Sequence, residues 1–190
     1  MKDFLFLYPL KTYFEGDCPQ RFKEQGHSLK RLDKIINARY RQKNYQIYWA
    51  VFSETAKKNR PDLSDLSEYL SIPTSDKIIT VGIPSSDLKQ GIYPQPSYIL
   101  EQLPNKESIS QLTIGGFHAT DCVEKLASLA CHQGWPVRVD DDTTELFFPR
   151  TLLKGNIPLK PATTLEDIME KEMVEFCRGL RQTQPWLPQI

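Results

Sequence analysis

The sequence lacks the features that most directly assign a protein to a function class. Its 24 basic residues are matched by 24 acidic residues, so the overall charge does not favour binding to nucleic acid or to an anionic membrane. No segment approaches the ~20 apolar residues that cross a bilayer. The apolar start, residues 1–10, is short and has no small-residue cleavage site, which favours a buried strand over a signal peptide.

Cysteine is also scarce, and its spacing is uninformative for metal or redox motifs. The four cysteines stand at positions 18, 122, 131 and 177, and none forms a C-x-x-C pair. A chain of 190 residues can build a core without disulfides, so this usage favours a reducing compartment. We therefore expect a soluble, cytoplasmic protein with no nucleic-acid and no membrane partner.

Several common functional motifs are missing from the sequence. It has no internal repeat, Gly-rich dinucleotide fingerprint, phosphate loop, nucleophile-elbow serine or metalloprotease motif. The acidic cluster Asp140–Asp142 could bind Mg²⁺ or Ca²⁺, but no second set of ligands lies nearby in the sequence. A turn or a helix cap explains these carboxylates at least as well. We expect no metal and no cofactor.

Apolar, β-favouring runs alternate along the chain with segments of helical periodicity. Strands are expected at 4–8, 45–52, 77–83, 112–114 and 135–139, and a further strand at 144–148 would form a hairpin with the last of these. Helices are expected at 28–43, where the basic residues read as a solvated face, and at 97–103, 121–133 and 164–179. This alternation predicts an α/β protein whose parallel sheet is covered on both faces, with one domain over residues 1–180 and a tail at 181–190.

The most informative stretch runs from Gln111 to Gly134. A short β-favouring run enters the pair Gly115–Gly116, which permits a tight turn or a close approach of another chain. Thr120 or Asp121 can then cap a helix, and Glu124 stands where a capping box needs it. This pattern places Cys122 in the first turn of a helix, at the carboxyl end of a strand.

That position gives Cys122 chemical significance. The helix dipole and the free N–H groups of a first turn favour the thiolate, and the same N–H groups could hold an oxyanion. Ligands of open parallel sheets also bind beyond the carboxyl ends of the strands. The alternative is that Cys122 is a small residue packed at a turn, since free cysteine is among the most buried residue types.

The segment from Gly116 to Val123, continuing through Ala127, Ala130, Gly134, Val137 and Asp140, resembles the nucleophile segment of the isochorismatase-like cysteine hydrolases. The N-terminal order of elements is similar, with an apolar strand followed by an aromatic residue at Phe14. The resemblance implies a three-layer α/β/α sandwich with a mainly parallel sheet. In active members it implies hydrolysis of an amide, an imide or a vinyl ether by a trio of aspartate, lysine and cysteine.

Only the cysteine of that trio carries over directly, to Cys122. Counting back from Phe14, the aspartate falls on Pro9, and the lysine falls near Tyr93, with Lys89 four residues away on the same loop. The threonine of the family turn is Ala119 here, and the histidines of the nicotinamidase metal site have no counterpart after the second strand. Two of the three catalytic positions are therefore not matched.

Three functions follow from these residues. The first is a divergent isochorismatase-like protein that has lost or altered the hydrolysis and keeps a small-molecule or partner site around Cys122. The second is an active cysteine hydrolase, with Cys122 as nucleophile, His118, Asp121 or a residue of the first loop as base, and Lys89 as a further helper. The third is an unrelated α/β binding protein. The predicted site adds the turn residues Ala119, Thr120 and Asp121 and the pocket residues Pro9, Phe14, Tyr93 and Phe117; a homo-oligomer is also expected.

Overall fold

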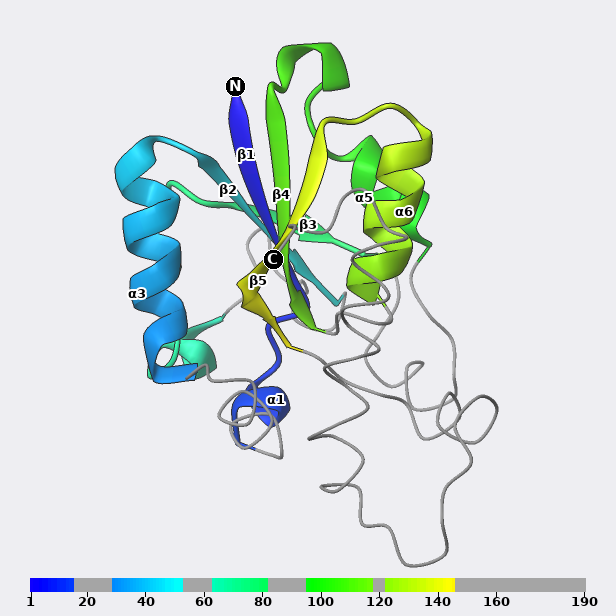
Figure 1. Cartoon of the computed structure of the whole chain (residues 1–190). Coiled ribbons are helices and arrows are strands. Elements are labelled where there is room, and N and C mark those ends of the chain that lie inside the picture. The colour runs from blue at the N-terminus through cyan, green and yellow to red at the C-terminus, as the bar shows by residue number, and fades with distance from the viewer. Residues whose placement is uncertain (16–28, 53–62, 82–94, 118–121, 146–190) are drawn as a thin grey trace, which may run out of the picture.

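The fold is built on a parallel sheet in which five strands run in the order β3-β2-β1-β4-β5 (Figure 1). The computed structural model describes residues 1–15, 29–52, 63–81, 95–117 and 122–145. The strands are β1 (Lys2–Leu7), β2 (Gln46–Val51), β3 (Lys77–Thr80), β4 (Gln111–Phe117) and β5 (Val137–Glu145). The predicted parallel sheet is therefore confirmed.

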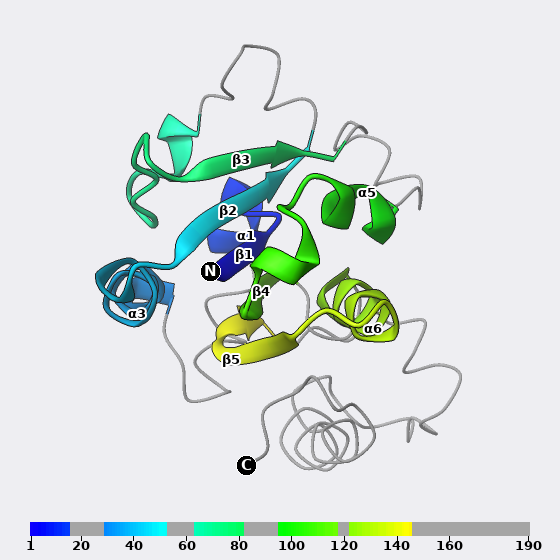
Figure 2. The same ribbon diagram turned by 90° about the horizontal axis from the view of Figure 1, so that it is seen from above.

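Helices cover both faces of this sheet, as Figure 2 shows from above. Helix α3 (Leu29–Arg39) lies on one face, and α5 (Pro96–Glu101) and α6 (Glu124–His132) lie on the other. The short helix α1 (Lys11–Glu15) follows β1 at the carboxyl ends of the strands. The result is the three-layer α/β/α sandwich that was predicted. Within the described ranges, no helix is both long and apolar enough to cross a membrane.

The apolar run from Phe4 to Leu7 in β1 is explained by the burial of this strand on both faces. Phe4 and Phe6 point into the core beneath α3, whereas Leu5 and Leu7 point into the core beneath α5 and α6. All four side chains are fully buried. Each such burial contributes about 1.5–3 kcal/mol, which is why the part of β1 from Phe4 to Leu7, covered on both faces, is apolar at each position.

The predicted hairpin after Val139 is wrong, because β5 continues through the aspartates as one strand parallel to β4. Between the pairs Ile114↔Val139 and Gly116↔Thr144, extra residues of β5 form a bulge. The hydroxyl groups of Thr143 and Thr144 donate to the Asp140 carbonyl across this bulge, at 3.1 and 2.7 Å. These bonds satisfy the backbone without a reversal of the chain.

The prediction that the basic residues at 28–43 form a solvated face holds for Lys34 and Lys43 and is wrong for Arg39. The α-helix ends at Arg39, and a 3₁₀ turn follows at Arg41–Lys43. The Arg39 guanidinium donates to both oxygens of Asp140, at 2.7 and 2.9 Å, and to Asp142 at 2.6 Å. The Tyr40 hydroxyl also donates a hydrogen bond to the carboxylate of Asp140, which is only 5% exposed. These contacts attach α3 to β5.

Candidate functional site

The candidate site lies at the edge of the sheet where the parallel strands end. Cys122 is half-buried and forms, with Val123, a π-helical turn immediately before α6. Its side chain packs against the core beneath α5 and α6. Short π-helical turns are frequent at functional sites. A thiol at the start of a nine-residue helix also sees the positive end of the dipole, which favours its thiolate.

The end of β1 contains an unusual backbone conformation at Tyr8. Its φ of +54° lies in the left-handed region, which is rare for a bulky residue. Strand alternation would direct Tyr8 to the same face as Phe6, but it joins the core of the opposite face, where its ring stacks on Phe52 at 4.7 Å. The Tyr8 N–H donates to the Ala50 carbonyl at 2.9 Å. These two contacts hold the strained residue in place.

Pro9 follows directly and is buried. It occupies the position where the resemblance expects an aspartate. Its side chain carries neither a proton acceptor nor a donor, and its backbone has no N–H. The side chain at this point of the sheet edge can therefore shape an apolar wall, but it cannot accept a proton from a thiol.

Two predicted pocket residues, Phe14 and Phe117, pack together. Their ring centroids lie 5.5 Å apart in an edge arrangement, and both side chains are buried in the core beneath α3. Cys122 belongs to the opposite core. Tyr13 packs against both cores and lies 5.0 Å from the Phe117 ring, so it borders the cysteine side and the aromatic side alike.

The glycine pair that precedes the turn is required by close packing. Gly116 has a φ of +116°, and a Cβ atom there would lie 2.4 Å from the Leu7 carbonyl oxygen. Only glycine adopts this conformation without strain and leaves room for β1. The prediction that Gly115–Gly116 permits a close approach of another chain is confirmed.

A second polar cluster lies at the opposite, amino edge of the sheet. Asp3 is fully buried, and neither carboxylate oxygen has a hydrogen-bond partner among the described residues. Burial raises the pKa of Asp3, and the N-terminal ammonium and Lys77 partly oppose that rise. Burial and the charge of Asp3 raise the pKa of Tyr48 to about 12. This pair lies far along the strands from Cys122 and is not part of the candidate site.

Several predicted site residues lie outside the described ranges. They are Lys89, Tyr93, His118, Ala119, Thr120 and Asp121. Within the described part of the chain, no group of three His, Cys, Asp or Glu side chains is arranged to hold a metal ion. Two of the carboxylates considered for a cation, those of Asp140 and Asp142, instead bind Arg39.

Sequence reasoning missed two tyrosines at this edge. Tyr8 was read only as the end of a strand, and Tyr13 was not considered. A signal was present in the order of residues, because a tyrosine directly precedes the position at which the family aspartate is expected. The left-handed backbone of Tyr8 could not be read from that order.

Comparisons with known proteins address the fold. No protein-family model and no curated protein sequence matches the chain. The structure is similar to the pyrazinamidase of Pyrococcus horikoshii solved in complex with zinc, with a TM-score of 0.54 and 13% identity over 100% of this chain and 99% of the other. It is also similar to N-carbamoylsarcosine amidase from Thermoplasma acidophilum, with a TM-score of 0.50 and 13% identity over 81% and 90%. The chain therefore has the isochorismatase-like α/β/α fold.

Proposed function

We propose that this protein binds a small molecule beside Cys122 and does not carry out efficient hydrolysis by an aspartate–lysine–cysteine trio. The observation that carries the proposal is Pro9, a buried residue without a titratable group at the place where the aspartate is expected. Loss of a general base costs ~10²–10⁴ in rate. A site that keeps its cysteine without that base is better suited to binding than to turnover.

The surroundings of Cys122 support binding of a small organic ligand. The thiol is half-buried at a helix start and packs against a core that contains the Tyr8 and Phe52 rings, against which Tyr13 of α1 also packs. Small-molecule sites are commonly apolar and aromatic with a few polar groups that fix orientation. Here the thiol and the N–H groups of the helix start would supply the polar contacts.

An active hydrolase is the second candidate, and the position of Cys122 favours it. A thiolate at a helix start can attack a carbonyl carbon, and the adjacent N–H groups can stabilise the resulting oxyanion. The base would then be His118, Asp121 or a residue of the first loop, with Lys89 as a further helper. No family model and no curated protein sequence matches the chain, so sequence comparison favours neither candidate over the other.

Alkylation with iodoacetamide across pH, followed by peptide mass spectrometry, tests whether Cys122 is activated. Cys131 is a matched control, because it is also half-buried but stands in the last turn of the same helix. We expect Cys122 to be alkylated with a midpoint below the ordinary thiol pKa of ~8.5, and at lower pH than Cys131. Equal alkylation midpoints for the two cysteines would show that the Cys122 thiol is not activated.

A second experiment measures ligand binding and hydrolysis separately, with Cys122→Ala as the variant. A panel of small primary amides and cyclic imides is screened for binding by thermal shift and for hydrolysis, with the native chain and Cys122→Ala. The proposal expects binding with turnover at least 100-fold below that of an amidase assayed on the same substrate. Rapid hydrolysis that Cys122→Ala abolishes would contradict the proposal and establish the hydrolase instead.

A further inference from the structure

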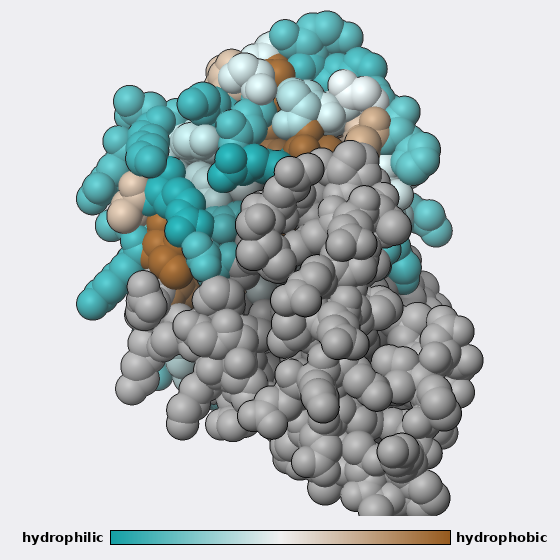
Figure 3. Space-filling view, viewed as in Figure 1, coloured by the Kyte–Doolittle hydropathy of each residue, from teal (hydrophilic) through white to brown (hydrophobic). Residues whose placement is uncertain are grey.

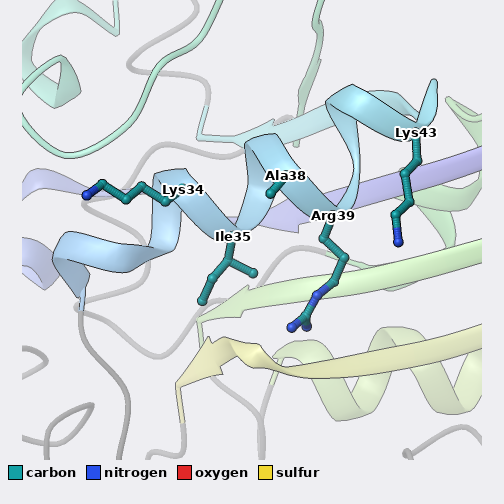
Figure 4. A pocket seen from close by; sticks show the side chains of 5 residues that line it. All are labelled: Lys34, Ile35, Ala38, Arg39 and Lys43. Atoms are coloured by element: carbon teal, nitrogen blue, oxygen red, sulfur yellow. The ribbon is translucent and has the colours of Figure 1, made fainter.

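A groove runs along α3 on the side that faces β5. It has a volume of about 460 Å³ and is lined by Lys34, Ile35, Ala38, Arg39 and Lys43. Figure 4 shows Ile35 and Arg39 extending toward β5, with Lys34 and Lys43 at the two ends of the groove. In the space-filling view, an apolar patch over α3 is surrounded by hydrophilic residues (Figure 3).

Two of the three positive charges that line this groove, those of Lys34 and Lys43, are not neutralised by any described residue. Arg39 is occupied by Asp140 and Asp142. Lys34 and Lys43 are exposed, and neither forms an ion pair or hydrogen bond within the described ranges. An apolar floor with a free ammonium group at each end is complementary to an amphipathic helix that carries carboxylates beside its apolar side chains.

We propose that the groove docks residues 164–178 of the same chain. The sequence predicts a helix in this segment, which lies outside the described residues. Five carboxylates stand in it against two basic residues: Glu166, Asp167, Glu170, Glu172 and Glu175, against Lys171 and Arg178. Its apolar residues recur at helical spacing: Leu165, Ile168, Met169, Met173 and Phe176. Both the charge and the apolar stripe match the groove.

The connection to β5 favours this occupant over a second copy. Arg39 binds Asp142, and β5 ends three residues later at Glu145, so the chain leaves the sheet beside α3. Eighteen residues, 146–163, connect that point to the acidic segment. Fully extended, eighteen residues span at most about 60 Å. Helix α3 is about 16 Å long, so the segment can reach the whole groove, and its covalent connection favours docking within the chain over docking of a second copy.

Zero-length carbodiimide cross-linking of the full chain tests the docking, because it joins a lysine only to a carboxylate in direct contact. We expect peptides that link Lys34 or Lys43 to carboxylates between Glu166 and Glu175. Mixing ¹⁵N-labelled and unlabelled chains distinguishes links within a chain from links between copies. Lys34→Glu with Lys43→Glu removes both amines of the groove and therefore its links to the segment. In that variant, reversal of Glu170 and Glu175 to lysine should restore carboxylate-to-lysine links in the opposite sense only if the segment lies in the groove.

The matched control is Lys2→Glu with Lys106→Glu, which makes the same charge change at exposed positions on the amino edge of the sheet. It should leave the links at Lys34 and Lys43 unchanged. Arg39 is retained in every variant because it holds β5. Links only between copies, or links from the segment to Lys125 on α6 across the sheet, would overturn the proposal. So would the absence of any link to α3 in a chain whose other lysines do react.

Discussion

Gly115 on β4 lies so close to Thr143 on β5 that a Cβ atom on the glycine would stand 2.3 Å from the threonine hydroxyl oxygen. Gly115→Ala should therefore force β5 away and lower the free energy of unfolding by about 1–3 kcal/mol. Urea denaturation measures this change. Thr143→Ala in the same chain removes the nearest atom and should recover part of the loss.

Gly134→Ala is the control for this substitution, because a Cβ atom at Gly134 would make only an ordinary contact of 3.9 Å with Lys106 Nζ, while φ there is +76°. Its cost should be about 1 kcal/mol from backbone strain alone. If Gly115→Ala has no effect, or if Thr143→Ala does not relieve it, the close contact between β4 and β5 is not maintained in solution.

Removal of the Arg39 side chain should expose the cost of an unpaired buried carboxylate. Arg39→Ala leaves Asp140, 5% exposed, with the Tyr40 hydroxyl as its remaining side-chain donor, and should destabilise the fold by about 2 kcal/mol. Asp142→Asn should cost less than about 1 kcal/mol, because that carboxylate is 41% exposed. Chemical denaturation of the two variants compares them, and equal losses would contradict the assigned roles.

Asp3 should make the native state less stable as pH rises. Its pKa is raised in the folded state, so the folded chain holds the proton more tightly than the unfolded chain. The contribution of protonated Asp3 to stability is then fully present below the ordinary aspartate pKa of 3.8. It is lost as pH rises through the raised pKa of Asp3 in the folded state. Asp3→Asn should remove this loss and stabilise the protein at pH 7 by about 1–3 kcal/mol.

Urea unfolding between pH 4 and pH 8 measures that difference. Tyr48→Phe serves as the comparison, since its hydroxyl also has no partner in the described part of the chain and its removal should not reduce stability at pH 7. A less stable Asp3→Asn variant at pH 7 would mean that the charged carboxylate is well solvated or paired.

Pro9→Asp tests whether this position faces the thiol. A carboxylate beside Cys122 would disfavour the thiolate, so the midpoint of iodoacetamide labelling should move to higher pH. Pro9→Asn is the matched control, because it makes a similar change in shape without the charge and should leave the midpoint near that of the native chain. Identical labelling curves for the two variants would show that Pro9 does not occupy the predicted place beside the cysteine.

The parallel sheet could be predicted because its signals are local and repeated. The continuous apolar run of β1 requires cover on both faces, and the alternation of strands with helical segments specifies how they connect. The start of a helical segment at Cys122 followed in the same way from the glycine pair and the apolar periodicity after it. These elements agree in propensity and pattern, so tertiary contacts had little to override.

The missed features all depend on contacts between distant positions. Arg39 and Asp140 are 101 residues apart, and nothing local distinguishes this arginine from its exposed neighbours. Three consecutive aspartates favour a turn, but the threonine hydroxyls and Arg39 satisfy the Asp140 carbonyl and carboxylate and keep the chain extended. The left-handed conformation of Tyr8 is held by Ala50 on the neighbouring strand β2 and by Phe52 just after it.

The bulge in β5 also affects how copies of this protein can meet. β5 is the last strand on its side of the described sheet, and a long, flat outer strand invites pairing with a strand of another molecule. Here the irregular backbone of the bulge interrupts such pairing halfway along the strand. The bulge beside the contact with α3 thus also disfavours the addition of a strand from another molecule, and with it aggregation through this edge.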